Sequence, residues 1–344
     1  MKMVTRTPVF RQHIDEPAAW TSETLGNAPR ERLSYALKPA HINAIDAMLA
    51  QTAVRSARDV RREDVDHGEF HVLMSDIEAL ITSGPGAVVI TGLDRERYDE
   101  AACERIFWAM GTCLGSATIQ NAAGDRMSHV TQDPNHPTER GYRGSGELSP
   151  HTDAYAILGL MCLQQAESGG FSHLASALAI HNEILATRPD LLPAMYEGTY
   201  YASMDARGTP VGATGAKVPL FSCVDGQVSC FFSRQNSSEA VRQTGVELTP
   251  EFAEAAAYFE KLAQDPRFRV EFMLDPGEIM LVNNYVLVHA RTEFTDSTRY
   301  KRDLLRLWLN NGEMRKVIPE MHLFAGIYDQ VFRFRAEQAA GAAH

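Results

Sequence analysis

The sequence has few of the features that mark several common classes of protein. Only five cysteines occur in 344 residues, and no two form a C-x-x-C pair, so neither a disulfide scaffold nor a structural zinc site is expected. No apolar run approaches the roughly 18 to 20 residues of a membrane span, and the first residues lack the apolar segment of a signal peptide. We therefore expect a cytoplasmic protein that does not enter a membrane.

Basic residues are outnumbered by acidic ones. Lys and Arg total 33 and Asp and Glu total 44, and the resulting formal charge of −11 would repel the phosphates of nucleic acid. The motifs G-x-x-x-x-G-K-[ST], G-x-G-x-x-G, G-x-S-x-G and H-E-x-x-H are all absent. These absences disfavour nucleic acid, nucleoside triphosphates, NAD, α/β-hydrolase chemistry and the usual zinc peptidases.

Hydrophobic periodicity predicts helices in the first part of the chain and mostly strands after it. Helices are expected at about 41–58, 70–83, 98–110, 177–196 with a break at Pro189, and 249–264. Strands are expected at 87–91, 156–163, 221–224, 228–232, 267–274, 278–282, 286–291 and 303–309. The polar stretch 111–150 is either a functional loop or a misread element. Because strands and helices do not alternate regularly, the pattern favours an α+β fold, a β-sandwich or jelly roll with helices outside it.

Four histidines are followed two residues later by a carboxylate, the spacing that puts two ligands on one face of a strand. The pairs are His13/Asp15, His67/Glu69, His151/Asp153 and His181/Glu183. The first two lie in charged or irregular segments, and the last lies in a predicted helix, where such side chains point about 200° apart. Only His151 and Asp153 open a strand region, although an isolated pair of this kind is more often a solvated strand edge.

A third histidine and two arginines occur in apolar strands near the other end of the chain. The sequence Asp-Pro-Gly-Glu at 275–278 predicts a tight turn before a strand, and the next strand carries His289. Taken alone, His289 is more often a core residue than a ligand. Arg302 and Arg306 interrupt the last apolar strand. An inward Arg306 would need an anionic partner, since an unpaired buried guanidinium is costly, and a bound dicarboxylate would supply one.

These stretches together resemble the TauD/TfdA family of iron(II) and 2-oxoglutarate dependent dioxygenases, which are related to the clavaminate-synthase-like oxygenases. The matching stretches are LSPHTDAYA at 148–156, ESGGFSHLAS at 167–176, DPGEIMLVNNYVLVHARTEF at 275–294 and KRDLLRLWLN at 301–310. AVVITGL at 87–93 matches less specifically. The resemblance implies a double-stranded β-helix, or jelly-roll, core, with Fe(II) as cofactor and 2-oxoglutarate and O2 as cosubstrates.

The resemblance also implies roles for individual residues. His151, Asp153 and His289 would form the facial triad that holds Fe(II) and leaves three positions open. Arg306 would clamp the C5 carboxylate of 2-oxoglutarate in bidentate fashion, and Arg302 would lie nearer the C1 carboxylate. Ser172 stands where relatives commonly have a Thr that hydrogen-bonds the cosubstrate, and Arg299 is an alternative anchor.

Substrate contacts in this family come from the loop before the H-x-D strand and from a later insertion, here about 120–150 and 200–236. The candidates, each with a solvated loop residue as the alternative, are Gln120, Asn121, Arg126, Tyr142, Arg143, Asp205, Arg207 and Arg234. Tyr155, two positions past Asp153 on the expected strand, is a candidate pocket wall. Asn283 and Asn284 are alternatively turn residues with no other role. The mixture of Arg, Gln and Tyr suggests a polar or carboxylated small molecule, such as one derived from an amino acid.

The expected activity is hydroxylation of an unactivated C–H bond in a biosynthetic small molecule, with decarboxylation of 2-oxoglutarate to succinate and CO2. Desaturation, epoxidation or cyclisation with the same cofactors is the alternative. A non-catalytic metal-binding jelly-roll protein is an alternative from another class, and a hydrolase built on Ser149 is a more remote one. The sequence does not decide whether the protein forms a homo-oligomer.

The domain organisation follows from the distance between the proposed ligands along the chain. The length allows one large domain or two small ones. Because His151 and His289 must meet at one metal, the region between them closes as one unit. We expect a single domain over 1–344, with an N-terminal extension over 1–64, a jelly-roll core with insertions over 87–310, and a frayed Ala-rich tail over 336–344.

Overall fold

The computed structural model describes residues 8–121, 124–132, 144–204 and 210–331. Over these residues the fold combines helices with two larger sheets and three two-stranded sheets, as the α+β prediction requires. None of the helices in these ranges is long and apolar enough to cross a membrane. The predicted tail, 336–344, lies outside the described residues.

The larger sheet joins strands from the whole length of the chain. Its strands are β1 (Ser34–Ala36), β2 (Ala87–Thr91), β3 (Ser116–Ala117), β4 (Met127–Thr131), β6 (Ile157–Gln164), β14 (Ile279–Asn283) and β17 (Asp303–Asn310). They are ordered β1-β2-β14-β6-β17-β3, and β4 also pairs with β17. Only the pair β1 and β2 is parallel among these seven strands.

The smaller sheet has four antiparallel strands in the order β13-β8-β15-β5. They are β5 (Leu148–His151), β8 (Ser172–Ser176), β13 (Arg269–Phe272) and β15 (Leu287–Arg291). The three short ladders pair β7 (Ser168–Gly169) with β16 (Phe294–Thr295), β9 (Ala202–Met204) with β10 (Pro210–Ala213), and β11 (Phe221–Val224) with β12 (Gln227–Cys230).

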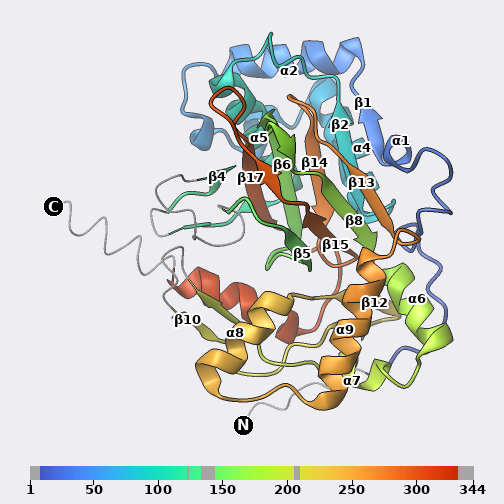
Figure 1. Ribbon diagram of the computed structural model, residues 1–344. Helices are drawn as coiled ribbons and strands as arrows, with labels where there is room; N and C mark the ends of the chain where they lie inside the picture. Colours follow the sequence, from blue (N-terminus) through green and yellow to red (C-terminus); the bar gives the residue numbers. More distant parts are fainter. Residues whose placement is uncertain (1–7, 122–123, 133–143, 205–209, 332–344) are drawn as a thin grey trace.

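Helices lie in two groups at opposite ends of the molecule (Figure 1). The first group is α1 (Pro29–Arg32), α2 (Pro39–Thr52), η1 (Ala57–Asp59), α3 (Arg62–Val65), α4 (Gly68–Thr82) and α5 (Glu100–Leu114). The second is α6 (Ala177–Thr187), α7 (Leu192–Glu197), α8 (Arg234–Thr244) and α9 (Pro250–Gln264), and the turn η2 (Pro319–His322) follows near the end. α4 packs on β2 and β14, α5 on β6 and β17, and α9 on β5 and β8.

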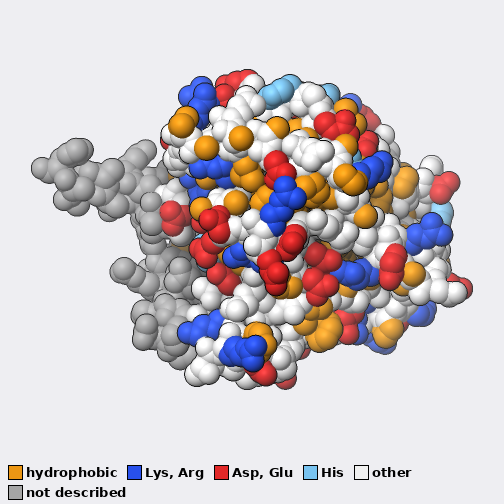
Figure 2. Space-filling model, turned by 90° about the horizontal axis from the view of Figure 1, so that it is seen from above, with side chains coloured by type: hydrophobic (Ala, Val, Ile, Leu, Met, Phe, Trp, Pro, Cys, Tyr) orange, Lys and Arg blue, Asp and Glu red, His pale blue; other side chains and the backbone are white. Residues whose placement is uncertain are grey.

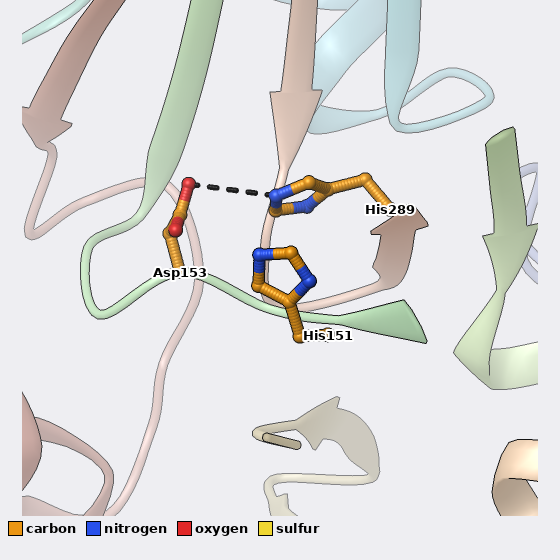
Figure 3. Close-up of side chains that lie close together, drawn as sticks. All are labelled: His151, Asp153 and His289. Carbon is orange, nitrogen blue, oxygen red and sulfur yellow. Dashed lines mark ion pairs between the residues drawn. The ribbon is translucent and has the colours of Figure 1, made fainter. Parts of the chain in front are cut away.

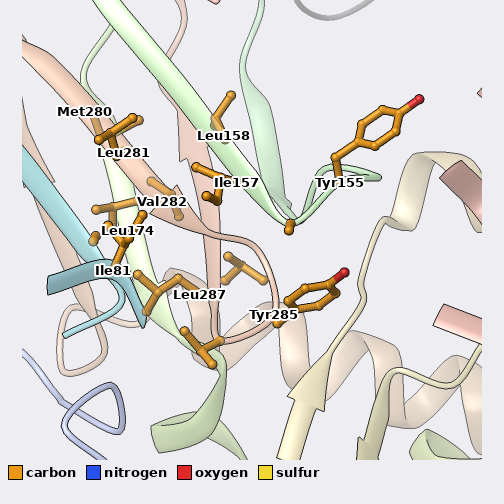
Figure 4. Close-up of a cluster of buried hydrophobic side chains, with 14 of the residues drawn as sticks. Ile81, Tyr155, Ile157, Leu158, Leu174, Met280, Leu281, Val282, Tyr285 and Leu287 are labelled. Atoms are coloured by element: carbon orange, nitrogen blue, oxygen red, sulfur yellow. The ribbon is translucent and has the colours of Figure 1, made fainter. Parts of the chain in front are cut away.

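Apolar side chains from both sheets meet in one core cluster (Figure 4). Leu174 and Leu287 come from the smaller sheet, and Ile157 and Leu281 come from the larger one. Burying a side chain of this size contributes about 1.5 to 3 kcal/mol. The core therefore holds the two sheets in a fixed relation.

The chain crosses between the two sheets at two neighbouring places. One crossing, 152–156, leads from β5 into β6, and the other, 284–286, leads from β14 into β15. Asn284 joins them, because its backbone N–H donates to Ala156 O (2.9 Å), its Nδ2 donates to Tyr155 O (2.9 Å), and its Oδ1 accepts from Asp153 N (3.2 Å). The loop that carries Asp153 is thus fixed against the entry to the strand that carries His289.

Most of the predicted elements are present, and β2 has the predicted bounds. The predicted helix 177–196 divides into α6 and α7, and the helix predicted to Arg58 ends at Thr52. The polar stretch 111–150 is a misread region, since it contains β3, β4 and β5. The Asp-Pro-Gly-Glu turn is confirmed, with Glu278 N donating to Asp275 O (2.9 Å) and a positive φ of 92° at Gly277.

The N-terminal residues that the structure describes pack into the fold. β1 extends the larger sheet beside β2, and the indole N–H of buried Trp20 donates to Pro85 O (2.8 Å). Arg30 pairs with Glu278 (2.6 Å) in the turn before β14. These contacts join the predicted extension to the strands that carry the site.

On one face of the molecule, charge is spread rather than gathered. On the face shown in Figure 2, acidic and basic side chains interleave. The formal charge of −11 therefore does not produce one acidic patch on that face.

Candidate active site

His151 and His289 meet because their strands are neighbours. β5 and β15 pair antiparallel with His151 directly opposite His289, and the two ring centroids lie 4.3 Å apart. The Nδ1–H of His151 donates to Ser149 O (2.8 Å). Because a carbonyl can only accept, this bond fixes the tautomer and leaves Nε2 of His151 with its lone pair available.

Asp153 lies in the connection to β6, beyond the end of β5 at His151. The expectation that the two residues share a strand face is therefore wrong, although both side chains reach the same place. The Asp153 carboxylate is held beside the two histidines by Trp308, whose Nε1–H donates to Asp153 Oδ2 (2.8 Å). Together with the Asn284 contact to the Asp153 backbone, this bond holds the carboxylate 3.6 Å from His289 Nε2 (Figure 3).

One nitrogen or oxygen atom from each of His151, Asp153 and His289 lies within 4.8 Å of the others. Two imidazoles and one carboxylate are the donor set of the facial triad of non-haem Fe(II) oxygenases. Donor atoms bound at about 2.1 Å to one ion lie about 3 Å apart when they are cis, so this set closes on a metal with small side-chain movements. The residues present thus fit an iron ion by both their chemistry and their spacing.

The surroundings keep His289 neutral. Burial, and to a smaller extent the neighbouring His151 and Arg306, lower the pKa of His289 to about 3, against an opposing effect of Asp153. The side chains of His289 and Asp153 are only 11% and 14% exposed. A neutral imidazole is the form that binds a metal, so this histidine is ready for a metal across the physiological pH range.

Arg306 approaches the triad from β17. It lies two residues before Trp308, so both side chains are on one face of the strand, and its guanidinium carbon is 4.0 Å from the centroid of the Trp308 ring. Arg306 is 6% exposed, and its Nε donates to Gln120 Oε1 (2.8 Å). Because Trp308 donates to Asp153, Arg306 lies close to the proposed ligands, and its charge also helps to lower the pKa of His289.

Arg302 lies in a different place, beside Ser172. The two residues line one small hollow together with Cys162 and Gly170. Arg302 is 6% exposed, burial lowers its pKa to about 10, and its buried Nη1 has no hydrogen-bond partner among the described residues. A Cβ on Gly170, where φ is +80°, would lie 3.2 Å from Arg302 Nε. The absence of a Cβ at Gly170 therefore leaves room for the Arg302 guanidinium.

The two arginines therefore have different surroundings, and which of them binds the distal carboxylate stays a prediction. The expected anchor of the distal carboxylate is Arg306, with Arg302 nearer the metal. The structure instead puts Arg302 with Ser172 and puts Arg306 beside Trp308 and the triad. Arg299, the alternative anchor, is exposed and its guanidinium lies over Tyr300, 5.0 Å from the ring centroid.

The substrate candidates before β5 separate into one inner residue and two outer ones. Gln120 is buried and bonded to Arg306. Asn121 bonds to Asp125 (2.8 Å) in a turn, and exposed Arg126 donates to Ala117 O (3.2 Å). Of these three, Gln120 contacts Arg306 beside the triad.

Other candidates have distinct outcomes. Tyr155 is 1% exposed, lies in the crossing rather than on a strand, and donates its hydroxyl to Asp329 Oδ1 (3.0 Å). The predicted strand-face position of Tyr155 is therefore wrong, and its ring packs 5.7 Å from that of Trp308.

Arg234 follows Ser233, whose backbone forms an isolated bridge with His151, and the buried Nη1 of Arg234 has no partner among the described residues. The remaining candidates lie outside the described residues: Tyr142, Arg143, Asp205 and Arg207.

Reasoning from the sequence did not single out Trp308 or Arg291, and it gave Asn284 no role beyond a turn. Trp308 positions Asp153, and Asn284 does more than complete a turn, because it also holds the Asp153 backbone. Arg291, two residues after His289, is buried, and burial together with nearby Arg302 lowers its pKa to about 9. A charged residue in the apolar strand of His289 was the one signal that could have indicated Arg291.

Comparisons with known proteins agree with this geometry. Residues 54–308 match the family described as "Taurine catabolism dioxygenase TauD, TfdA family". FR-33289 synthase of Streptomyces rubellomurinus (strain ATCC 31215) is 34% identical over 264 residues, which are 73% of this chain and 77% of that protein.

Two solved structures share the fold at low identity. Asparagine oxygenase in complex with Fe(II), 2S,3S-3-hydroxyasparagine and succinate matches with a TM-score of 0.63 and 18% identity, covering 81% of this chain and 93% of that one. The non-heme iron oxygenase OrfP in complex with Fe and alpha-ketoglutaric acid matches with a TM-score of 0.60 and 18% identity, covering 80% and 93%.

The family match and the site together define an Fe(II)/2-oxoglutarate-dependent dioxygenase. The chain belongs to the TauD/TfdA family, and Fe(II), 2-oxoglutarate and O2 are the cofactor and cosubstrates of its reaction.

Proposed function

We propose that this dioxygenase hydroxylates an unactivated C–H bond of a polar, amino-acid-derived small molecule, with Fe(II) held by His151, Asp153 and His289. The observation that carries the proposal is the convergence of one donor atom from each residue within 4.8 Å. The amino-acid class is supported by the solved structures, since one contains 3-hydroxyasparagine and OrfP was solved with (3S)-hydroxy-L-Arg. Buried Gln120 and the Nη1 of Arg234, which has no partner in the part of the chain that the structure describes, supply polar groups near the triad strands.

The fold assigned to this function is a double-stranded β-helix, or jelly roll, over 87–310 within a single domain spanning 1–344. Its support is the alternation of successive strands between the two sheets: β5 is in the smaller sheet, β6 in the larger, β14 in the larger and β15 in the smaller. The two crossings joined by Asn284 lie where the proposed ligands meet. The proposed active site is therefore at the junction of the two sheets.

In the proposed cosubstrate site, Arg302 and Ser172 bind the distal carboxylate of 2-oxoglutarate, and Arg306 lies toward its C1 end. The support is the position of Arg302 beside Ser172 with its Nη1 unpartnered, and the position of Arg306 near His289. These roles are the reverse of those that the resemblance alone implies. A guanidinium suits this task because its fork of donors matches a carboxylate.

The chemistry that iron and 2-oxoglutarate supply when bound is oxidative decarboxylation coupled to hydrogen abstraction from the substrate. The residues of this chain orient the participants. Ser149 O fixes the tautomer of His151, and Trp308 holds one oxygen of Asp153 in place. A non-catalytic binding protein would be expected to have Arg302 and Arg306 facing outward, whereas both are buried.

A substrate screen tests the proposal. The Fe(II)-loaded chain is incubated with 2-oxoglutarate and O2 and with free amino acids and their simple derivatives, and succinate and product masses are measured. We expect substrate-dependent succinate and a product that has gained one oxygen atom. A product that has lost two hydrogens would show desaturation instead. Full turnover by the variant Asp153→Ala would show that the proposed ligand set is wrong.

A further inference from the structure

A second buried guanidinium lies beside Arg302. Arg291 of β15 is 5% exposed, and its guanidinium carbon is 4.7 Å from the centroid of the Phe294 ring. The guanidinium carbon of Arg302 is 5.3 Å from the same centroid. Because both distances share that centroid, the two guanidinium carbons are at most 10.0 Å apart.

Only neutral groups hold Arg291 in place. Its Nη2 donates to Gly144 O (3.0 Å) and also to Gly146 O, and its Nε donates to Thr292 O (3.2 Å). Its Nη1 is buried and has no hydrogen-bond partner among the described residues. Neither Arg291 nor Arg302 forms a direct ion pair with a carboxylate of the described ranges, although Asp296 and Asp303 act on Arg302 from a greater distance. Two buried positive charges thus lie within 10.0 Å of each other without a directly bonded carboxylate among the described residues.

Another buried arginine of the chain shows the contrast. Arg315 is as buried as Arg291, and both of its terminal nitrogens donate to the Glu16 carboxylate at 2.8 Å. A buried charge without such a partner is costly, and two like charges near each other add to that cost. The pair Arg291 and Arg302 is therefore suited to an anion that comes from outside the protein.

We propose that Arg291 is the second cation of the cosubstrate pocket and sets its preference for a doubly charged 2-oxo acid over a singly charged one. The inference rests on the proposed function, in which Arg302 and Ser172 bind the distal carboxylate. The hydrogen bonds to neutral carbonyls hold the Arg291 charge in place without neutralising it. At an effective dielectric constant of about 20, a charge about 10 Å from a carboxylate changes its binding roughly tenfold.

The test compares two ligands that share the same oxo-acid head. Anaerobic calorimetry measures the Kd of 2-oxoglutarate and of 2-oxopentanoate, which lacks the distal carboxylate, for the full Fe(II)-loaded chain. In wild type we expect 2-oxoglutarate to bind more tightly. The measured quantity is the Kd of 2-oxopentanoate divided by the Kd of 2-oxoglutarate. In Arg291→Gln and Arg291→Met, which remove the charge, this Kd ratio should fall roughly tenfold.

Two further variants separate charge from loop anchoring. Arg291→Lys keeps the charge but cannot bridge two carbonyls, so the Kd ratio should stay close to that of wild type. Arg269→Gln removes a cation of strand β13, in the same sheet, that is already paired with Glu271 (3.4 Å), and it should also leave the ratio unchanged.

The outcomes are distinguishable. If Arg291 only anchors residues 144–146, its Gln, Met and Lys variants will raise the Kd of both ligands by the same factor. The Kd ratio will then be unchanged, and this result overturns the inference. If one of the neutral variants, Arg291→Gln or Arg291→Met, fails to fold, the other still measures the Kd ratio. A lowered Kd ratio in Arg291→Lys also overturns the inference. A wild-type chain that does not prefer 2-oxoglutarate contradicts the proposed function instead.

Discussion

Each of the three proposed metal ligands is positioned by a contact from a different part of the chain. Ser149 O fixes the ring of His151, Trp308 of β17 holds Asp153, and the pairing of β15 with β5 puts His289 opposite His151. A misplaced ligand would leave the donor set incomplete, because a facial triad needs all three groups on one side of the ion. Residues outside the triad therefore contribute to metal affinity.

The Trp308 hydrogen bond gives a direct prediction. Trp308→Phe removes the donor to Asp153 Oδ2 but keeps an aromatic ring, although a smaller one. We expect Fe(II) affinity to fall about 10-fold to 100-fold, the range typical for lost partners of metal ligands. Anaerobic Fe(II) titration measures this affinity. The matched control is Trp108→Phe, since Trp108 is equally buried but donates to Val60 O (3.0 Å) far from the triad in sequence and fold. Equal losses in the two variants would contradict the assigned role.

A histidine away from the site gives a prediction for stability. His181 of α6 is fully buried beside Tyr196, and burial lowers its pKa to about 4. Because its pKa in the unfolded chain is about 6.5, the unfolded state binds the proton first, so the free energy of unfolding falls as the pH drops from about 6.5 to 4.

The size of that loss can be isolated with one variant. Between pH 7 and pH 5, His181 should lower the free energy of unfolding by about 2 kcal/mol. Denaturant unfolding at the two pH values measures the change in wild type and in His181→Leu. The variant should lose about 2 kcal/mol less over this interval. An equal change in the free energy of unfolding in both proteins would show that the pKa of His181 is not lowered in the folded state.

At the scale of residues, the resemblance to the dioxygenase family was needed to select the proposed triad, because the residue pattern alone favours a strand edge for His151 and Asp153 and a core position for His289. The structure brings one donor atom from each of the three within 4.8 Å of the others. Trp308 and Asn284 act across strands that are distant in the sequence. The roles of Arg302 and Arg306 likewise depend on which strand each one faces, and one chain without its fold does not contain that information.

Among the secondary-structure elements, the turn between β7 and β8 has a specific effect on the site. Gly170 follows β7 with a φ of +80°, and its missing Cβ leaves the space that Arg302 Nε and Cδ occupy. The neighbouring backbone is fixed too, because the N–H groups of Gly170 and Phe171 both donate to Thr292 Oγ1 (3.1 Å and 2.9 Å). The turn therefore sets where the Arg302 guanidinium can lie.

A pair of alanine variants tests this effect. Gly170→Ala places a Cβ 3.2 Å from Arg302 Nε, whereas Gly226→Ala, at a φ of +82° in the β11–β12 turn, meets no atom within 4 Å. Both variants should lose about 1 to 2 kcal/mol of stability because a non-glycine residue resists positive φ. Only Gly170→Ala should raise the Kd of 2-oxoglutarate, by several-fold as measured by calorimetry. A similar increase in Gly226→Ala would mean that the backbone strain, not the contact, is responsible.

Prediction of the elements succeeded where periodicity was strong. The apolar run of β2 and the capped start of α9, where Thr249 Oγ1 accepts from Phe252 N (3.2 Å), were found with nearly the right bounds. α8 was missed because RQNSSEAVRQT is almost entirely polar and gives no apolar stripe. β8 was missed although it lies between β13 and β15, since such pairing is not visible in a short local sequence.

For the molecule as a whole, the site depends on how the two sheets are joined. The crossings at 152–156 and 284–286 come from distant parts of the chain, and Asn284 holds them together. The acidic surface and the cationic interior are also separate properties, because Arg291, Arg302 and Arg306 are buried in a chain of net charge −11. Selective binding of an anionic cosubstrate then depends on a few inward guanidinium groups rather than on the overall charge.

The central claim is that His151, Asp153 and His289 together hold the iron that binds 2-oxoglutarate. Anaerobic titration of the full chain with Fe(II) and then 2-oxoglutarate, followed by visible charge-transfer absorption, tests it most directly. We predict that wild type develops a band that saturates at one Fe(II) and one 2-oxoglutarate per chain. The folded variants His151→Ala, Asp153→Ala and His289→Ala should each bind Fe(II) far more weakly. Wild-type affinity and an unchanged band in all three variants would contradict the account.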